Sequence, residues 1–371
     1  MINSERYHRQ ILLKEFGEEA QKKLLAAKVL VIGAGGLGCP ALLYLAAAGV
    51  GTIGIVDFDV VDVANLHRQI IYCVSDIGKQ KVDVSAKRLN DLNPEIETIK
   101  FNVNLRADNA FEIISKFDLV IDGSDNFPTR YLVNDVCLIL DKPLVYGSVL
   151  RFEGQVGVFN LKDEETNVKA NYRDLFPEPP EAGSTFSCNE AGVLGVLPGI
   201  IGTMQATEAI KIIAGIGKPL CNRIISYNAL SNLFYEFEIT SSNFWASSTP
   251  KAESEVLGYN YELFCNILKK KNQISIEEFE SRRNIEKLNI IDVRELNEIP
   301  AVNEFNYTCI PMSEFKSKIT SIDILETIVI FCKSGNRSDK AVNILKEVFP
   351  ECKAYSLTGG IEAWKNHHQF N

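Results

Sequence analysis

The sequence predicts an α/β protein built from a doubly wound sheet and a second, smaller α/β domain. Three observations lead there: apolar strands alternate with helices through the first two thirds of the chain, a Ser-rich segment follows, and the alternation then resumes. Strands that alternate with helices form parallel sheets with helices on both faces. We therefore place the first domain at residues 1–242, a linker at 243–262 and the second domain at 263–371.

The elements of the first domain are short and easily separated. We expect strands at residues 28–32, 52–56 and 118–121, because each is an apolar run of four or five residues. Apolar spacing predicts helices at residues 39–49, 79–92 and 200–214. Residues 162–187 contain prolines and charges without periodicity and are expected to form a long crossover loop.

A glycine-rich turn follows the first strand. Such a turn lets the backbone approach a phosphate group, and Asp57 at the end of the next strand is placed to bind a ribose hydroxyl. The pattern defines a Rossmann-like fold, but by itself it fits a dinucleotide dehydrogenase equally well, and Asp57 could simply cap a turn. The glycines of this turn are Gly33, Gly35, Gly36 and Gly38.

The residues after Asp57 depart from a dehydrogenase. Asn65 and Arg68 suit contacts with ribose and phosphate oxygens, and Lys81 in the next helix suits a second phosphate contact. Asp125 follows another strand, where a carboxylate can bind Mg²⁺ on a polyphosphate. These residues favour ATP over NAD.

The same residues carry a resemblance. The first domain resembles the adenylyltransferases that activate ubiquitin-fold sulfur carriers, a family related to ubiquitin-activating enzymes. The match covers about two thirds of the chain and rests on the glycine-rich turn and on these motifs: Arg6-Tyr7-His8-Arg9-Gln10, Asp57-Phe58-Asp59, Asn65-Leu66-x-Arg68-Gln69, Gly78-x-x-Lys81, Asp125-Asn126, Glu153-Gly154-Gln155 and Cys188-x-x-Ala191-Gly192-Val193.

The resemblance implies ATP and Mg²⁺ as cofactors and a carrier protein ending in Gly-Gly as substrate. It also implies that Arg9 reaches the ATP of a second subunit, which predicts a homodimer. The residues expected at the nucleotide and its metal are the four glycines of the turn, Asp57, Asp59, Asn65, Arg68, Lys81, Asp125 and Asn126, with Asp125 as the Mg²⁺ ligand.

The chain departs from this family at the structural zinc site. The family holds zinc with two Cys-x-x-Cys pairs. Here Asn171 and Asp174 stand where the first pair would be, and the second would fall near residues 243–247, which contain no cysteine. We therefore expect no zinc.

The second domain contains a cysteine in a loop between a strand and a helix. Cys332 follows the apolar run 328–331 and precedes Gly335, Arg337 and Ser338. Backbone N–H groups of such a loop and the helix N-terminus point at the sulfur and stabilise a thiolate or persulfide. The sequence therefore predicts a persulfide loop.

This domain resembles a rhodanese over about 100 residues. The motifs are Ile291-Asp292-Val293-Arg294-Glu295, Cys332-x-x-Gly335-x-Arg337-Ser338 and Leu357-Thr358-Gly359-Gly360-Ile361-x-Ala363-Trp364. The family's His-x-x-Gly-Ala step before Ile310-Pro311 is missing. The alternative to a sulfurtransferase is an inactive rhodanese kept for docking.

Cys188 is the second cysteine of interest. It follows the proline-rich loop and begins a predicted helix, which would favour its thiolate. The resemblance implies an acyl-accepting or disulfide-forming thiol, and the alternative is an inert cysteine. Most of the other seven cysteines lie in apolar runs and are expected in the core.

Composition excludes several classes of protein. The formal net charge is −9 and the pI about 5.2, so a nucleic-acid partner is not expected. No apolar run is long enough to span a bilayer, and the first residues lack the apolar core of a signal peptide. We expect a cytoplasmic protein.

Together these features predict an adenylyltransferase fused to a sulfurtransferase. ATP would activate the C-terminal glycine of the molybdopterin synthase small subunit, and a Cys332 persulfide would then yield a thiocarboxylate. The thiazole-pathway carrier is the alternative substrate, and a cysteine desulfurase or another sulfur donor would load Cys332. An NAD-dependent oxidoreductase and a non-catalytic carrier-binding scaffold are the alternatives of other classes.

Overall fold

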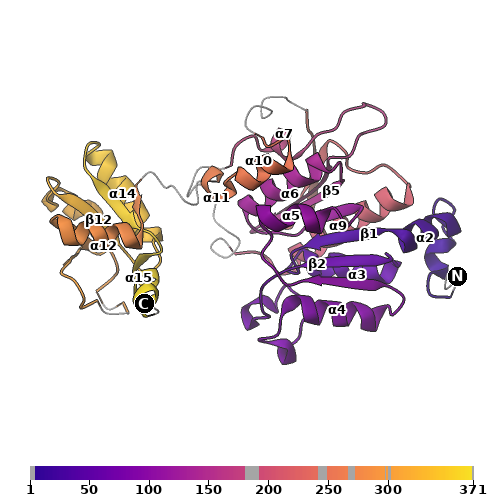
Figure 1. The fold of residues 1–371 in the computed structure, drawn as a ribbon, viewed down its shortest axis with the longest axis horizontal. Helices are drawn as coiled ribbons and strands as arrows, with labels where there is room; N and C mark the ends of the chain where they lie inside the picture. The colour runs from indigo at the N-terminus through magenta and orange to yellow at the C-terminus, as the bar shows by residue number, and fades with distance from the viewer. Residues whose placement is uncertain are drawn as a thin grey trace. The chain divides into compact units, whose positions relative to one another are not determined.

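The computed structural model describes residues 5–179, 192–240, 249–265, 272–296, 298–299 and 302–369. The chain forms two compact units, Met1–Cys265 and Asn266–Asn371, each with its own sheet (Figure 1). Cys188 lies outside the described residues.

An eight-stranded sheet forms the centre of the first unit, in the order β3-β2-β1-β4-β5-β6-β7-β8. The strands from β3 to β5 are parallel, which confirms the predicted doubly wound α/β sheet. These five strands are β1 Lys28–Ile32, β2 Thr52–Val56, β3 Glu97–Phe101, β4 Leu119–Asp122 and β5 Leu144–Leu150.

Three antiparallel strands extend this sheet beyond β5. They are β6 Glu153–Phe159, β7 Arg223–Asn228 and β8 Leu233–Glu238. The sequence analysis expected only parallel strands. The chain reverses between β5 and β6 at Arg151, whose φ is +53°, and arginine is not a residue that marks such a turn in a sequence. Strand β8 is the edge, and all six of its residues are exposed.

Helices cover both faces of the parallel strands. Alternate residues of β1 face opposite sides: Val29 and Val31 join the core under α2, α3, α4 and α9, whereas Leu30 and Ile32 join the core under α5 and α6 (Figure 1). The helices and short 3₁₀ turns of this unit are α1 His8–Ile11, α2 Gly17–Ala26, α3 Gly38–Ala48, η1 Val63–Asn65, η2 Val74–Asp76, α4 Lys81–Leu92, α5 Ala107–Ile114, α6 Phe127–Ile139, α7 Tyr172–Leu175, α9 Leu197–Ala214, α10 Glu253–Gly258 and α11 Tyr261–Phe264.

The region expected to be an irregular crossover loop contains a buried helix. Residues 170–173, at the start of α7, are all buried. Arg173 bonds Asp135 of α6, and the Tyr261 hydroxyl of α11 donates to the same carboxylate. Helices α10 and α11 thus belong to the first compact unit, whereas the sequence analysis placed residues 243–262 in the linker. Its Ser-rich composition does not reveal these long-range contacts.

The second unit contains a five-stranded parallel sheet in the order β11-β10-β12-β13-β9. Ile328 and Ile330 of β12 face one core, and Val329 and Phe331 face the other, so this unit is also α/β, as predicted. Its elements are β9 Gln273–Ile274, α12 Ile276–Ile285, β10 Leu288–Asp292, β11 Thr308–Cys309, α13 Phe315–Lys318, η4 Ile319–Ser321, β12 Thr327–Phe331, α14 Asn336–Val348, β13 Ala354–Leu357 and α15 Gly360–Gln369.

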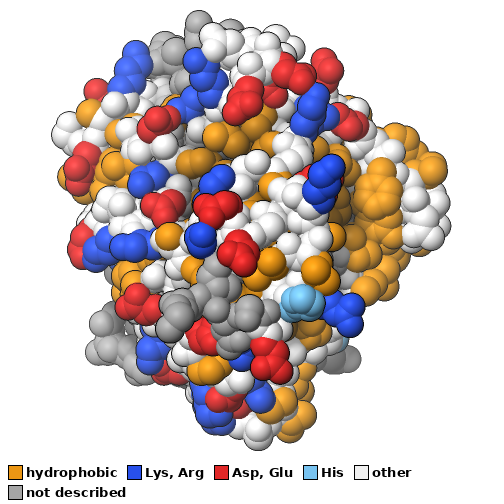
Figure 2. Space-filling view, turned by 90° about the vertical axis from the view of Figure 1, so that its right-hand side faces the viewer, with side chains coloured by type: hydrophobic (Ala, Val, Ile, Leu, Met, Phe, Trp, Pro, Cys, Tyr) orange, Lys and Arg blue, Asp and Glu red, His pale blue; other side chains and the backbone are white. Residues whose placement is uncertain are grey.

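The surface carries charges of both signs. On the face drawn in Figure 2, Lys and Arg side chains are interspersed with Asp and Glu, and hydrophobic side chains gather along one side. Within the described ranges, no helix combines the length and apolar character needed to cross a membrane.

Candidate functional site

The main cleft of the first unit lies where the order of the parallel strands reverses. Strand β1 pairs with β2 on one side and β4 on the other, and the helices that follow β1 and β4, α3 and α6, lie on opposite faces of the sheet and leave a crevice between them. The turns after β1 and β4 approach closely at Gly33 and Gly123: a Cβ on Gly33 would lie 2.9 Å from the Gly123 oxygen. Gly33 has a φ of +88°, so this position requires glycine.

The rest of the glycine-rich turn leads into α3. A Cβ on Gly38, the first residue of α3, would lie 1.9 Å from the Gly33 oxygen, which explains why no side chain fits there. A Cβ on Gly36 would lie 3.0 Å from Pro198 of α9. The turn therefore exposes bare backbone and a helix N-terminus to the crevice, which suits an anion.

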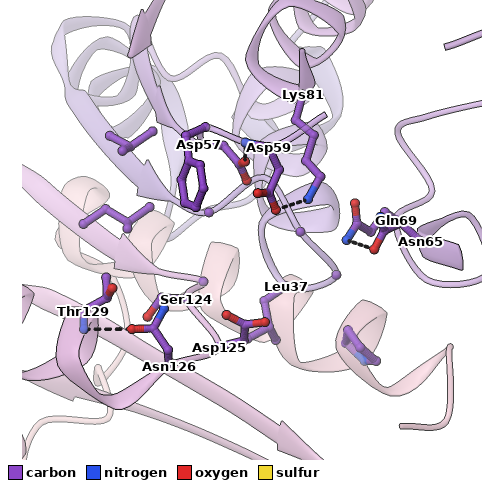
Figure 3. A pocket seen from close by; sticks show the side chains of 18 of the residues that line it. Leu37, Asp57, Asp59, Asn65, Gln69, Lys81, Ser124, Asp125, Asn126 and Thr129 are labelled. Atoms are coloured by element: carbon purple, nitrogen blue, oxygen red, sulfur yellow. Dashed lines mark hydrogen bonds and ion pairs between the residues drawn. The ribbon is translucent and has the colours of Figure 1, made fainter. Parts of the chain in front are cut away.

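Asp57 follows β2 and is held by two backbone groups. Its carboxylate accepts hydrogen bonds from the N–H of Ala34 and of Asp59, each at 2.8 Å. Burial raises the pKa of Asp57, and the Lys81 charge and these hydrogen bonds oppose that rise. Asp57 is thus fixed at the rim of the crevice (Figure 3).

Lys81 and Asp59 form an ion pair on the same side of the cleft. Lys81 Nζ lies 2.9 Å from Asp59 Oδ2, and the side chains are 5% and 53% exposed. Burial in the first turn of α4 holds the lysine in place, while the carboxylate faces solvent (Figure 3). A phosphate group entering the cleft can replace the carboxylate as the lysine's partner.

Asn65 holds the side chains of Arg68 and Gln69 in place through hydrogen bonds. Its Oδ1 accepts hydrogen bonds from Arg68 Nη2 at 3.2 Å and Gln69 Nε2 at 3.1 Å. Gln69 is buried, and its Oε1 has no hydrogen-bond partner among the described residues. A buried amide oxygen that lines the cleft without a partner indicates a ligand or water in the working protein.

Asp125, Asn126 and Ser124 follow β4 on the opposite side of the crevice. Asn126 Oδ1 accepts the Thr129 N–H at 3.0 Å and so begins α6. Asp125 is exposed and lines the cleft (Figure 3). The buried Ser124 hydroxyl has no partner within the described part of the chain. An exposed carboxylate opposite two cations, Lys81 and Arg68, is an arrangement that suits a nucleotide with its metal.

Of the residues predicted for the nucleotide site, all but two line the cleft. The exceptions are Gly38, which supports the turn from behind, and Arg9, which lies in the exposed helix α1. The sequence analysis did not select Ser124, Thr129 or Leu105 as site residues, and Gln69 appeared only within a motif. Ser124 and Leu105 follow β4 and β3, so the rule that ligands bind at the carboxyl ends of parallel strands would have found them.

The second unit holds Cys332 at the carboxyl end of β12. Its side chain is 1% exposed, and its Sγ accepts the Gly335 N–H at 3.1 Å. The Ser338 hydroxyl lies 3.5 Å from the same sulfur. Gly335 has a φ of +97°, which only glycine adopts easily and which turns its N–H toward the sulfur. The predicted loop therefore exists, with donors aimed at the sulfur.

Arg337 is the second residue of α14 and already has a partner. Both of its terminal nitrogens bond the carboxylate of Glu298, and Nη2 lies 2.6 Å from Oε2. Glu298 was not among the residues singled out from the sequence. Its partner is 39 residues away, and no local pattern connects the two.

The folds and sites define a nucleotide-binding α/β domain joined to a domain with a cysteine-centred anion loop. The ThiF family matches residues 7–245, and the rhodanese-like domain matches residues 275–367. The chain belongs to the ThiF family and carries a C-terminal rhodanese-like domain. It is an enzyme with an ATP-using adenylyltransferase domain and a sulfurtransferase domain.

Three curated relatives are similar over much of their length. The probable adenylyltransferase/sulfurtransferase MoeZ of Mycobacterium tuberculosis is 42% identical over 98% of this chain and 93% of its own. The adenylyltransferase and sulfurtransferase MOCS3-1 of Zea mays is 36% identical over 97% of this chain and 81% of its own. The sulfur carrier protein adenylyltransferase of Thermus thermophilus is 46% identical over 71% of this chain and 97% of its own.

Solved structures support the fold of the first unit. A crystal structure of Escherichia coli MccB with ATP superimposes with a TM-score of 0.53 and covers 64% of this chain and 72% of that one. The two are 22% identical, so this likeness concerns the fold alone.

Proposed function

We propose that the first unit adenylates the C-terminal glycine of a ubiquitin-fold sulfur carrier. The observation that carries this proposal is the cleft itself, in which bare glycine backbone, two cations and the exposed carboxylate of Asp125 face one another. A carboxylate is a poor electrophile. Its attack on the α-phosphate of ATP forms an acyl adenylate and releases pyrophosphate, so that the carbonyl acquires AMP as a leaving group.

Each residue has a role suited to its contacts. The backbone of the glycine-rich turn, Lys81 and Arg68 would bind phosphate oxygens and offset the charge that develops during transfer. Asp57 would bind the ribose, and Asn65 would position Arg68. Supporting this, Gln69 Oε1 and Ser124 Oγ are buried at the cleft without partners among the described residues.

Asp125 would hold Mg²⁺ bound to the polyphosphate. Its carboxylate is exposed at the cleft, as expected of a ligand that shares the ion with substrate oxygens. The ion would neutralise charge on the departing pyrophosphate.

Cys332 would carry the sulfur as a persulfide. Its terminal sulfur attacks the acyl adenylate, AMP leaves, and an acyl disulfide forms. The Cys188 thiolate would then attack the Cys332 sulfur, which releases the thiocarboxylate and leaves a disulfide that an external thiol reduces. The N–H of Gly335, 3.1 Å from Sγ, supports the anionic form of Cys332.

The partners follow from this chemistry. The carrier we propose is the molybdopterin synthase small subunit, with the thiazole-pathway carrier second. A relative from Porphyra purpurea, 39% identical over 97% of this chain and 92% of its own, is described as a probable molybdopterin-synthase adenylyltransferase. A cysteine desulfurase or a similar donor would load Cys332 in the cytoplasm, where thiols stay reduced.

We also propose a homodimer in which Arg9 serves the partner subunit's nucleotide. Arg9 does not line the cleft of its own chain, and its helix is followed by Leu12 and Leu13, which are 63% and 57% exposed. Exposed leucines beside an arginine that does not line its own cleft suit an interface between subunits.

The test is ATP–pyrophosphate exchange with each candidate carrier. We expect exchange with the molybdopterin synthase small subunit and loss of exchange in Asp125→Ala. Asp91→Ala, an exposed carboxylate on α4 paired with Lys87, is the matched control and should keep exchange. Cys332→Ala should keep exchange within about twofold but form no thiocarboxylate. Exchange that survives Asp125→Ala, or that is lost in Cys332→Ala, would contradict the proposed division of labour.

A further inference from the structure

The persulfide loop contains two cationic side chains, and a carboxylate neutralises each of them. Lys333 Nζ lies 3.4 Å from Glu362 Oε1, with both side chains about half exposed. Arg337 bonds Glu298 through both terminal nitrogens, with the two side chains 33% and 27% exposed. The stronger pair is therefore the bidentate one at the start of α14.

Glu298 is itself fixed in a tight turn. Its Oε1 accepts the Glu295 N–H at 2.9 Å, and its own N–H donates to the Glu295 oxygen at 3.1 Å. The pKa of Glu298 is lowered to about 2, mainly by the hydrogen bond from Arg337. The carboxylate is therefore charged at neutral pH. The Arg337 guanidinium of the persulfide loop is thus paired with a fixed negative charge.

Arg337 belongs to the loop around the sulfur, between Gly335 and Ser338, which both approach Cys332 Sγ. The hydrogen bond and charge of Glu298 raise the pKa of Arg337. A third cation, Arg294, follows β10 and packs over Phe331 with 5.5 Å between its Cζ and the ring centroid. Asp292 neutralises Arg294, with 2.7 Å between Nη2 and Oδ2 and only 4% of either side chain exposed.

Paired cations in the persulfide loop should affect two classes of sulfur donor differently, because the donors differ in charge. Inorganic thiosulfate is a small dianion, and to meet a thiolate it needs cations that are not already paired. An organic persulfide on a cysteine presents its sulfur with at most one local charge. Each donor transfers one sulfur atom to the Cys332 thiolate, and the leaving group is sulfite from thiosulfate or a thiolate from the persulfide.

We propose that Glu298 determines sulfur-donor specificity: by occupying Arg337 it disfavours thiosulfate and reserves Cys332 for organic persulfides. Glu298 acts through Arg337 and is a positioning residue. The proposal rests on the proposed role of Cys332 as the sulfur acceptor.

The test uses the full-length chain with two donors. Sodium thiosulfate is assayed by thiocyanate formation from cyanide, and cysteine persulfide is assayed by the mass gain of one sulfur on the protein. In Glu298→Gln we expect the KM for thiosulfate to fall about tenfold, with kcat changed less than about twofold, because Arg337 is released from its counter-charge. Loading from cysteine persulfide should change less than about twofold.

Three variants separate charge from structure. Glu326→Gln removes the same charge at the other end of β12, about 20 Å along the chain from Cys332, and should leave both donors unaffected. Glu298→Asp keeps the charge and should keep the wild-type preference. Arg337→Gln added to Glu298→Gln should abolish the gain with thiosulfate.

Two results would overturn this inference: an unchanged thiosulfate KM in Glu298→Gln, or an equal gain with both donors, which would indicate a loosened loop. Cys332→Ala tests the underlying assignment separately. If that variant still formed thiocyanate and still gained the sulfur, the proposed role of Cys332 would fail whatever Glu298 does.

Discussion

Arg173 and Asp135 form an ion pair that is wholly withdrawn from solvent, with 2.7 Å between Nη2 and Oδ2 and neither side chain exposed. The guanidinium also faces aromatic rings, with its Cζ 4.9 Å from the Tyr131 centroid and 4.8 Å from the Phe264 centroid. Burial alone would lower the pKa of Arg173, but the hydrogen bond and charge of Asp135 raise it. The pair joins α6 and α7, and the rings and Tyr261 add α11.

Breaking this pair should destabilise the first unit. We expect Asp135→Ala to cost about 3–5 kcal/mol, because it leaves a buried guanidinium without a counter-charge. The control is Asp141→Asn, which removes an exposed charge from a surface pair with Lys169, suits the positive φ of this residue and should cost less than about 1 kcal/mol. Hydrogen exchange of α6 and α11 in the full chain measures the difference. Equal protection in the two variants would show that the pair contributes little.

The nucleotide preference should depend on Lys81. Calorimetry should show tighter binding of ATP with Mg²⁺ than of NAD, and Lys81→Met should weaken ATP binding at least about tenfold, because a buried phosphate contact is lost. Lys79→Met is the matched control, since Lys79 is 57% exposed and pairs with Asp76 outside the cleft. If NAD bound more tightly than ATP, the assignment of the cleft would be wrong.

Metal analysis should find no stoichiometric zinc in the purified protein. Asn171 and Asp174 occupy the positions of two expected ligands and bond each other, with 2.9 Å between Nδ2 and Oδ2. Asn171 Oδ1 also accepts the Arg173 N–H at 2.8 Å, so this side chain is already committed. Elemental analysis after dialysis checks the expectation. One zinc ion per chain that resists dialysis would refute it.

Cys188→Ser should separate adenylation from sulfur release. Pyrophosphate exchange needs only the nucleotide cleft and should persist, whereas thiocarboxylate release should slow because no second thiolate resolves the acyl disulfide. An external thiol should partly restore release. Mass spectrometry of single-turnover mixtures follows each species, with Cys73→Ser, an exposed cysteine outside the cleft, as the control. A wild-type yield without added thiol would make Cys188 a packing residue.

Local motifs explain which parts of the cleft could be predicted. The turn from Gly33 to Gly38, Asp57 and Lys81 each follow a strand or begin a helix, so their places at the carboxyl edge of the sheet follow from the chain order. The partnership of Asp59 with Lys81 does not, although both residues were selected. It depends on how α4 packs, and they lie 22 residues apart.

Long-range pairing explains what the sequence did not reveal. Asp135 and Arg173 are 38 residues apart, and Tyr261 is 126 residues from Asp135. Nothing in the composition of residues 162–187 or 243–262 signals these contacts, so both segments were interpreted as irregular. The pairing of β6 with β7 was missed for the same reason, since Glu153 pairs with Asn228, whereas the β5–β6 and β7–β8 hairpins are local and were missed because their turns carry no clear glycine signal.

The cluster around Arg173 has a chemical consequence for a protein that handles reactive sulfur. The side chains that hold these helices together are an amide, two carboxylates, a guanidinium and a phenol, and none of them is a thiol that a persulfide could modify. The ion pair and hydrogen bonds that fasten α7 and α11 to α6 therefore involve no sulfur atom, so a sulfur donor or a reductant finds no group to attack in these bonds.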